Sequence, residues 1–246
     1  MVNREKEEKL VEDLKDPDEK DSGKLSRMID QCLRRWHKVY CATDWHLWVR
    51  KEKGKSECHK AKNFEEILKS VNETMTKDDI LIYLGDLVDG EFQDKEELKS
   101  VLKTIPGKKI LVRGNNDLFT SAFYKSCGFC DVVESFVWHN VVFSHMPCKN
   151  DNDINIHGHL HSDRWDPEYW IPYSNNIDIA WLGARQHPVE LDKIISPITL
   201  KKYKKHVKEN PSKFQEGYYI YNRNIYNLFD EVMSELFIID PHRNED

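Results

Sequence analysis

Five short stretches of the chain place Asp, Asn or His residues directly after an apolar run. Their side chains offer carboxylate oxygens, an amide oxygen and imidazole nitrogens, a donor set that suits divalent ions such as Mn, Fe or Zn. There are more donors than one tetrahedral ion needs, and they would serve two ions about 3.5–4 Å apart that share one carboxylate. Two such ions generate a hydroxide at neutral pH and stabilise an in-line displacement at phosphorus. The residues are Asp44, His46, Asp86, Asp89, Asn115, Asn116, Asp117, His145, His159 and His161.

Each stretch is a weak signal when it is taken alone. "DWH" at 44–46 is a pattern that surface residues form by chance, and "GDLVD" at 85–89 is typical of a turn after a strand. "GNND" at 114–117 together with "GHLH" at 158–161 is more specific. All five stretches in this order, each after an apolar run, favour one shared site over coincidence.

The elements that would position these residues follow from the periodicity of the apolar residues. Strands are predicted at 38–43, 79–84 and 108–112, and amphipathic helices at 63–75 and 94–105. This β-α-β-α-β order predicts a layered α/β fold with parallel strands. Because ligand sites form at the carboxyl ends of such strands, the polar residues are expected to meet at one edge of the sheet.

The second half of the chain is richer in consecutive strands. Residues 132–144 predict a hairpin that turns at His139-Asn140, and residues 153–157 predict a further strand. Residues 25–37 predict a short helix laid on the domain, 199–214 a basic helix, and 218–240 an aromatic-rich segment with a helical part. We therefore expect a charged N-terminal extension with a short helix at 1–36, a catalytic domain at 37–195 and a C-terminal helical and aromatic appendage at 196–246.

The composition limits the partners of the chain. A net charge of −6 and a pI near 6.0 lack the basic balance of a general polyanion binder, so a nucleic-acid partner is not indicated, although it stays open. No apolar run reaches the roughly 18 residues of a membrane span, and the charged N-terminus lacks the apolar core of a secretory signal. The sequence predicts a cytoplasmic protein that acts on a small substrate, and it leaves the oligomeric state open.

The five stretches together resemble a known family. The order Asp-x-His, Gly-Asp-x-x-Asp, Gly-Asn-x-Asp, a lone His and Gly-His-x-His is similar to that of calcineurin-like metallophosphoesterases, over about residues 38–195. "SHMP" at 144–147 and "PVELDKI" at 188–194 are most similar to small bacterial and phage members. The resemblance implies an α/β (α+β) fold of the four-layer type, in which helices flank a two-sheet β sandwich. It also implies a hydrolase that acts on a small phosphoester or a nucleotide.

The resemblance also implies a ligand set for two divalent ions, Mn²⁺ first, with Fe, Zn or Ni as alternatives. Asp86 would bridge the two ions, and Asp89 and Asp117 would orient ligands, a role that metal sites generally require. The first ion would be held by Asp44, His46, Asp86 and His161, and the second by Asp86, Asn115, His145 and His159.

The chain departs from the family at Asn116, where most members carry a His that donates a proton to the leaving oxygen. An amide forms hydrogen bonds but cannot act as a general acid at neutral pH. We therefore count Asn116 as a catalytic and substrate-binding candidate and Asp117 as a catalytic candidate. Arg113 is a further substrate-binding candidate, because a guanidinium suits phosphate oxygens; a structural pair with an acid is the alternative.

Three functions fit this departure. General acid catalysis typically contributes 10²–10⁴-fold, and its loss should harm simple monoester hydrolysis most. The favoured function is therefore a phosphodiesterase. A phosphomonoesterase, acting on proteins or nucleotides, is the second interpretation. A non-catalytic, metal-bound scaffold module is the third.

Overall fold

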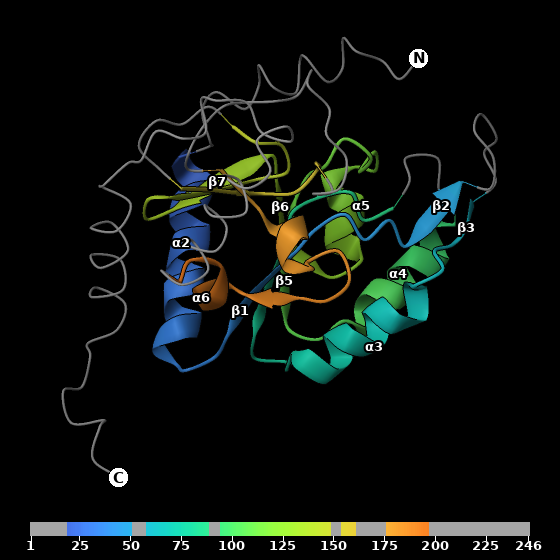
Figure 1. The fold of residues 1–246 in the computed structure, drawn as a ribbon, viewed down its shortest axis with the longest axis horizontal. Coiled ribbons are helices and arrows are strands. Elements are labelled where there is room, and N and C mark those ends of the chain that lie inside the picture. Colours follow the sequence, from blue (N-terminus) through green and yellow to red (C-terminus); the bar gives the residue numbers. More distant parts are fainter. Residues whose placement is uncertain (1–18, 51–57, 89–93, 149–153, 161–175, 197–246) are drawn as a thin grey trace, which may run out of the picture.

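The structure is a computed structural model that describes residues 19–50, 58–88, 94–148, 154–160 and 176–196. Helices and strands alternate in its first half, and strands dominate its second half (Figure 1). The helices are α2 (Glu19–Arg34), α3 (Phe64–Thr74), α4 (Lys95–Thr104), α5 (Ser121–Ser126), the 3-10 helix η1 (Ile179–Leu182) and α6 (Leu191–Ile194). The strands are β1 (Val39–Ala42), β2 (Trp48–Arg50), β3 (Cys58–Lys60), β4 (Ile80–Tyr83), β5 (Lys108–Val112), β6 (Phe129–Val133), β7 (Ser135–Trp138), β8 (Val141–Ser144), β9 (Ile154–His157), β10 (Asn176–Asp178) and β11 (Val189–Glu190).

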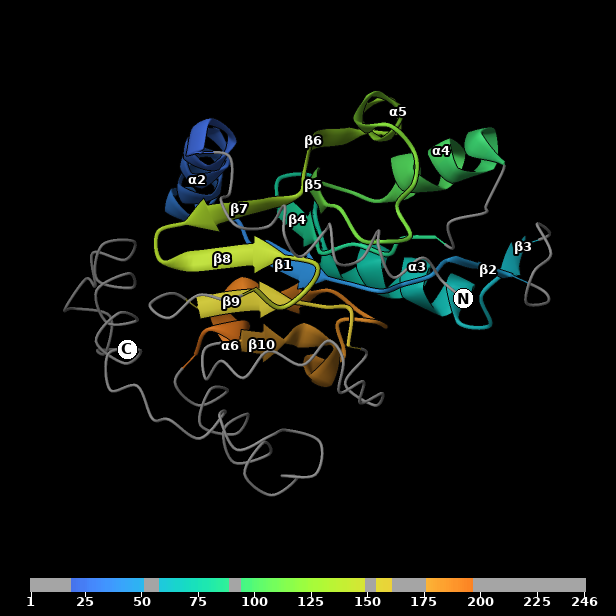
Figure 2. The same cartoon turned by 90° about the horizontal axis from the view of Figure 1, so that it is seen from above.

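Two sheets form the centre of the fold. The five-stranded sheet has the order β11-β1-β4-β5-β6, in which β1, β4, β5 and β6 are parallel and β11 is antiparallel. The four-stranded sheet has the order β10-β9-β8-β7, with only the β7–β8 pair antiparallel. Figure 2 shows the two sheets as separate layers, with α3 and α4 outside the first. A short hairpin of β2 and β3 stands apart from both sheets.

The central strands β1, β4 and β5 of the first sheet are buried on both faces, except for Lys108 at the start of β5. Side chains of β1, β4 and β5 alternate between two apolar clusters, as Val39 and Tyr40 illustrate. One cluster fills the space between the two sheets, and the other lies under α3, α4 and α5. Each fully buried Leu or Ile stabilises the fold by about 1.5–3 kcal/mol. Near-continuous apolar runs are typical of parallel strands that are covered on both sides.

Helix α2 contributes to the cluster between the sheets. Leu25 and Ile29 are fully buried there, and the helix packs against β7 and β1. It ends in a Schellman motif: Trp36 adopts a left-handed conformation with φ 62°, and the backbone N–H of His37 donates to the carbonyl of Cys32. This motif explains why the helix stops at Arg34, before the predicted end at 37, while its start lies earlier, at Glu19.

The predicted fold class is confirmed: the chain is a mixed α/β protein with two sheets flanked by helices. The predicted strands and helices between 38 and 112 match β1, α3, β4, α4 and β5 to within two residues at each end. The predicted hairpin at 132–144 is only partly correct. Its turn at His139-Asn140 joins β7 to β8, but residues 132–133 belong to β6 in the other sheet, since the chain changes sheet at Glu134.

The segments predicted at 199–214 and 218–240 lie outside the described residues, and so do residues 1–18 of the predicted extension. The boundaries at 36 and 195 stay predictions.

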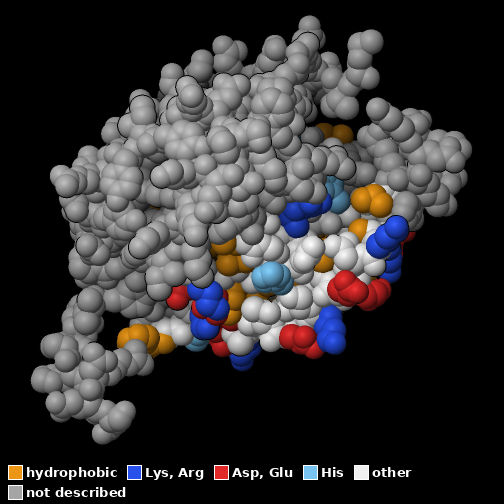
Figure 3. Space-filling view, in the orientation of Figure 1, with side chains coloured by type: hydrophobic (Ala, Val, Ile, Leu, Met, Phe, Trp, Pro, Cys, Tyr) orange, Lys and Arg blue, Asp and Glu red, His pale blue; other side chains and the backbone are white. Residues whose placement is uncertain are grey.

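Where the face in Figure 3 shows described residues, cationic and anionic side chains lie next to each other over α3 and α4. No helix among the described residues is long and apolar enough to cross a membrane.

Candidate metal centre

Five loops bring their polar residues together at the carboxyl ends of the strands. They follow β1, β4 and β5 of the first sheet and β8 and β9 of the second. Backbone hydrogen bonds tie neighbouring loops together: Asp44 N donates to the carbonyl of Gly85, and His46 N donates to that of Asp86. In the same way, Gly158 N donates to the carbonyl of His145. The side chains are therefore carried by a hydrogen-bonded edge that both sheets share.

The backbone at this edge is strained. Among the described residues, six that are not glycine have positive φ, and four of these carry candidate ligands. The four angles are 52° at Asp44, 41° at His46, 59° at Asp86 and 68° at His159. Left-handed conformations of such residues are uncommon and cluster at functional sites. Tyr83 helps to hold one of them, since its hydroxyl accepts from Trp45 N at 2.8 Å and donates to the Asp86 carbonyl at 3.2 Å.

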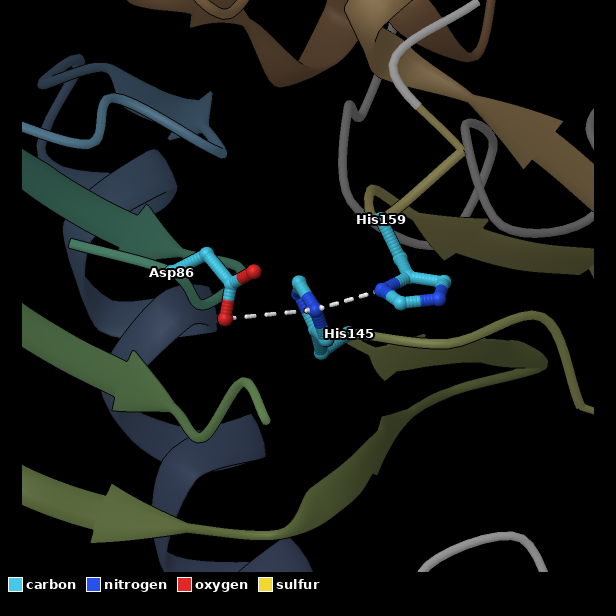
Figure 4. Close-up of side chains that lie close together, drawn as sticks. All are labelled: Asp86, His145 and His159. Carbon is cyan, nitrogen blue, oxygen red and sulfur yellow. Dashed lines mark hydrogen bonds and ion pairs between the residues drawn. The ribbon is translucent and has the colours of Figure 1, made fainter. Parts of the chain in front are cut away.

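The ligand atoms form two groups that share Asp86. One group consists of Asp44, His46 and Asp86, and the other of Asp86, His145 and His159; within each, the ligand atoms lie within 4.8 Å of one another. The Oδ2 atom of Asp86 faces the first group, 3.7 Å from His46 Nε2. Its Oδ1 atom faces the second, 3.5 Å from His145 Nε2. Figure 4 shows Asp86, His145 and His159 pointing toward one another from three separate strand ends.

His145 is oriented for a ligand at Nε2. Its Nδ1 lies 2.7 Å from the carbonyl of Leu84, and since a carbonyl can only accept, Nδ1 carries the proton. Nε2 lies 3.0 Å from Asn115 Oδ1 and 3.1 Å from His159 Nδ1. Burial lowers the pKa of His145, but the carboxylates of Asp86 and Asp44 and the bond to Leu84 outweigh it and raise this pKa. With Asp86 Oδ1, which lies 3.5 Å from His145 Nε2, four electron-rich atoms lie close together, and such a group suits a positive charge.

Asp44 is held by short hydrogen bonds on the other side of the site. Its Oδ2 atom accepts from the backbone N of His159 at 3.0 Å and from the hydroxyl of Thr43 at 2.7 Å. The carboxylate is almost fully buried. Because it also contacts the loop that carries His159, Asp44 links the two ligand groups.

Asp117 holds the backbone around Asp86. Its Oδ2 atom accepts from Asp86 N at 2.9 Å and Gly114 N at 2.8 Å, and its Oδ1 atom accepts from Leu87 N at 3.2 Å. Burial and the nearby Asp86 carboxylate nevertheless raise the pKa of Asp117 to about 6. Three buried carboxylates, of Asp44, Asp86 and Asp117, thus crowd one edge, and divalent cations would relieve their repulsion.

Two glycines allow these loops to approach each other. Gly85 has φ 84°, and a Cβ there would lie 2.5 Å from His145 Nδ1. A Cβ at Gly114 would collide with the carboxylate of Asp86. The glycines of the "GDLVD" and "GNND" stretches therefore serve the close packing of the ligand-bearing loops. The oxygen and nitrogen donors, the carboxylate that two groups share and the excess of negative charge fit a pair of divalent ions.

The other predicted residues have different surroundings. His161 and Asp89 lie outside the described residues. Arg113 donates to the carbonyl of Asp117 at 3.2 Å and to Ser121 Oγ at 3.1 Å, and its Nε lies 3.4 Å from Glu134. Asn116, by contrast, contacts the Asp86 carboxylate directly.

Apart from Asp117, the sequence did not identify the groups that position the ligands. Thr43 and Tyr83 carry no pattern that marks them as site residues, and the carbonyl of Leu84 is a backbone atom that any residue supplies. The only signal available was position, since all three lie within three residues of a candidate ligand. His157 is the last residue of β9 and is fully buried. Burial lowers its pKa to about 4, so its imidazole is neutral at pH 7.

The chain was compared with known proteins. A family model described as calcineurin-like phosphoesterase matches residues 37–239. Comparison with curated proteins gave no significant match. Among solved structures, a protein of unknown function from Aquifex aeolicus is 23% identical, with a TM-score of 0.44 over 64% of this chain and 97% of that one. A nuclease from Pseudomonas putida is 20% identical, with a TM-score of 0.39 over 50% of this chain and 61% of that one.

Proposed function

This chain belongs to the calcineurin-like phosphoesterase family, and from that premise we propose that it is a phosphodiesterase with a dinuclear metal centre. The family match and the Asp and His groups that could hold metal support metal-dependent hydrolysis of a phosphoester. The proposal concerns the number of ions, the residues that hold them and the kind of ester that is cleaved.

The observation that supports a dinuclear centre is the position of Asp86 between two ligand groups. Its two carboxylate oxygens face different histidines, His46 and His145. A carboxylate shared in this way is what two neighbouring ions require. We assign Asp44, His46, Asp86 and His161 to one ion and Asp86, Asn115, His145 and His159 to the other.

Two divalent cations held there, Mn²⁺ in our proposal, would supply a hydroxide nucleophile and neutralise charge at phosphorus. The chain's own residues keep the ligands in place. Leu84 fixes the proton of His145 on Nδ1, Thr43 and the His159 backbone hold the Asp44 carboxylate, and Asp117 holds the loop of Asp86. We propose residues 37–195 as the catalytic unit. A cytoplasmic location stays a prediction of the sequence.

The preference for a diester rests on Asn116. Its amide cannot donate a proton to an alkoxide leaving group at neutral pH, and a contribution of about 10²–10⁴-fold from a general acid is therefore lost. A diester carries one negative charge where a monoester carries two, so its hydrolysis depends more on the nucleophile and on the ions. Asn116 keeps amide hydrogen-bonding capacity for the substrate, because its Nδ2 carries two protons and one of them is directed at Asp86.

A comparison of two chromogenic substrates tests this function. Purified full-length protein with Mn²⁺ is expected to hydrolyse bis(p-nitrophenyl) phosphate faster than p-nitrophenyl phosphate. Asn116→His restores a group that can donate a proton, and we expect it to raise the rate on an alkyl monoester such as glycerol 2-phosphate more than the rate on p-nitrophenyl phosphate, because an alkoxide needs a proton to leave and nitrophenolate does not. Faster wild-type turnover of the monoester would show a phosphomonoesterase, and no metal-dependent turnover of either ester would contradict the enzymatic function.

A further inference from the structure

Asn116 makes two hydrogen bonds to the carboxylate that both ligand groups share. Its backbone N donates to Asp86 Oδ1 at 2.9 Å, and its side-chain Nδ2 donates to Asp86 Oδ2 at 2.7 Å. One residue thus contacts both oxygens of the shared carboxylate. Oδ1 is the oxygen that faces His145, and Oδ2 is the oxygen that faces His46.

These two bonds fix the orientation of the carboxylate plane. Rotation of a carboxylate about its Cβ–Cγ bond is soft, because this torsion has a broad, two-fold profile. The bond from the Asn116 backbone fixes Oδ1 only, whereas the bond from the side chain fixes Oδ2 as well. Hydrogen bonds to an ionised acceptor are short and about twice as strong as neutral ones. The 2.7 Å distance from Nδ2 lies in that short range.

The bond geometry also depends on the loop that carries Asn116. Asp117 N donates to the Gly114 carbonyl, and Asp117 Oδ2 accepts from Gly114 N, so residues 114–117 form a closed turn. The same Oδ2 atom accepts from Asp86 N. The backbone and the side chain of Asp86 are therefore both held by this turn, the backbone through Asp117 and the carboxylate through Asn116.

We propose that Asn116 is a positioning residue for the bridging carboxylate, and that its side-chain amide sets the affinity of the centre for its metal ions. This inference rests on the proposed dinuclear function. It assigns the residue at this position a role that does not involve proton transfer: the amide holds Asp86 in the orientation in which each oxygen faces one ligand group. Contacts of this kind around metal ligands typically change metal affinity by about 10–100-fold when they are removed.

Isothermal titration of the metal-free, full-length protein with Mn²⁺ tests the proposal. Asn116→Ala removes Nδ2 and leaves the backbone donor to Oδ1 in place, so we expect about 10-fold or more weaker binding with the number of sites unchanged. Asn116→Asp keeps the shape of the side chain and removes the donor. We expect Asp86 to lose its orientation in this variant too, and the affinity for Mn²⁺ to fall. Leu118→Ala is the matched control, because Leu118 is an exposed side chain of the same loop (62% exposed), and it should bind Mn²⁺ as the wild type does.

The melting temperature of the metal-free variants separates positioning from a general structural role. Asn116→Ala removes a hydrogen bond to a buried carboxylate, so its metal-free form should melt about 3–10 °C below the wild type while its Mn²⁺ affinity falls. Asp79→Ala removes hydrogen bonds to a carboxylate at the other end of β4 and should lose similar stability with unchanged Mn²⁺ affinity. An Asn116→Ala affinity within twofold of the wild type, or an equal loss of affinity in Asp79→Ala, would overturn the proposal. If the wild type binds Mn²⁺ and shows the Asn116 effect but cleaves no phosphoester, the positioning role stands and the proposed function fails.

Discussion

A buried carboxylate lies near each end of strand β4, Asp79 before its first residue and Asp117 beside the loop that follows it. The two carboxylates differ in how their negative charge is stabilised. Asp79, just before β4, accepts from Lys38 N at 2.8 Å, Thr76 N at 2.7 Å and Thr76 Oγ1 at 2.9 Å. Burial raises the pKa of Asp79, but these hydrogen bonds outweigh it, and the net pKa is lowered. Asp117, near the other end of the strand, likewise accepts three hydrogen bonds, all from backbone N–H groups, yet its pKa is raised to about 6.

The difference between the two ends comes from the deeper burial of Asp117 and from its carboxylate neighbour rather than from hydrogen bonds. Asp117 lies beside the Asp86 carboxylate in a fully buried position, and Asp79 has no such neighbour among the causes of its shift. At the amino-terminal end of the strand, hydrogen bonds from the chain itself therefore satisfy the buried carboxylate of Asp79. The carboxyl-terminal end carries excess negative charge and left-handed backbone at Asp44, Asp86 and His159, and bound cations would complete it. Function at one end and stability at the other should respond separately to mutation.

The largest effect is expected for Asp86→Ala, which removes the carboxylate that both ligand groups share. Metal ions contribute several kcal/mol to the stabilisation of charge in the transition state, and each 1.36 kcal/mol is tenfold in rate. We therefore expect turnover of both nitrophenyl esters to fall by about a thousandfold or more.

The control for this prediction is Asp79→Ala at the other end of the same strand, which should keep wild-type turnover per folded molecule. Mn²⁺ should raise the melting temperature of the wild type and of Asp79→Ala, because a ligand that binds only the folded state stabilises it. It should do so much less for Asp86→Ala. Equal loss of activity in both variants would show that the two ends are not independent.

A smaller effect, on stability, is expected for Asp79→Ala. Hydrogen bonds to a charged group contribute about 1.5–3 kcal/mol, so the free energy of unfolding at pH 7 should fall by about that amount. The folded pKa of Asp79 lies below the unfolded value of 3.8. Its contribution is thus fully present above pH 3.8 and is lost as the pH falls through the lower, folded value.

Urea denaturation at pH 7 and at pH values below 3.8 measures this contribution. The gap between the wild type and Asp79→Ala should be largest at pH 7 and should narrow as the carboxyl becomes protonated. A gap that is constant across the acid range would mean that Asp79 stabilises the fold by packing alone and not through its ionised carboxylate.

The sequence predicted the site through a topological rule. Parallel strands end at the same edge, so Asp44, Asp86 and Asn115, which follow β1, β4 and β5, had to lie close together whatever the details of the loops. The strands themselves were recognisable because both of their faces are buried and their apolar runs are continuous. The same reasoning placed His145 and His159 at this edge once their strands were recognised.

Features that depend on single turns could not be predicted in this way. The contact of Asn116 Nδ2 with Asp86 depends on the turn at 114–117, and the pKa of Asp117 depends on burial that no pattern reveals. The change of sheet at Glu134 was missed because β6 and β7 are separated by one residue and read as one continuous run. The sequence likewise gave Asp79 no role, since its partners are mostly backbone N–H groups.

The smallest effect is expected for a substitution of Arg113. This prediction distinguishes a residue that binds substrate from one that only supports the loop around the site. Its guanidinium donates to the Asp117 carbonyl and to Ser121 Oγ, and its Nε lies 3.4 Å from Glu134, whose side chain is 58% exposed. Neutral acceptors and an exposed ion pair contribute about 0.5–1.5 and 0–1 kcal/mol, respectively. Arg113→Gln should therefore lower the free energy of unfolding by about 1 kcal/mol and change the KM for the diester less than twofold. A KM raised tenfold or more at unchanged stability would instead make Arg113 a substrate-binding residue, because a lost phosphate contact weakens substrate binding without unfolding the loop.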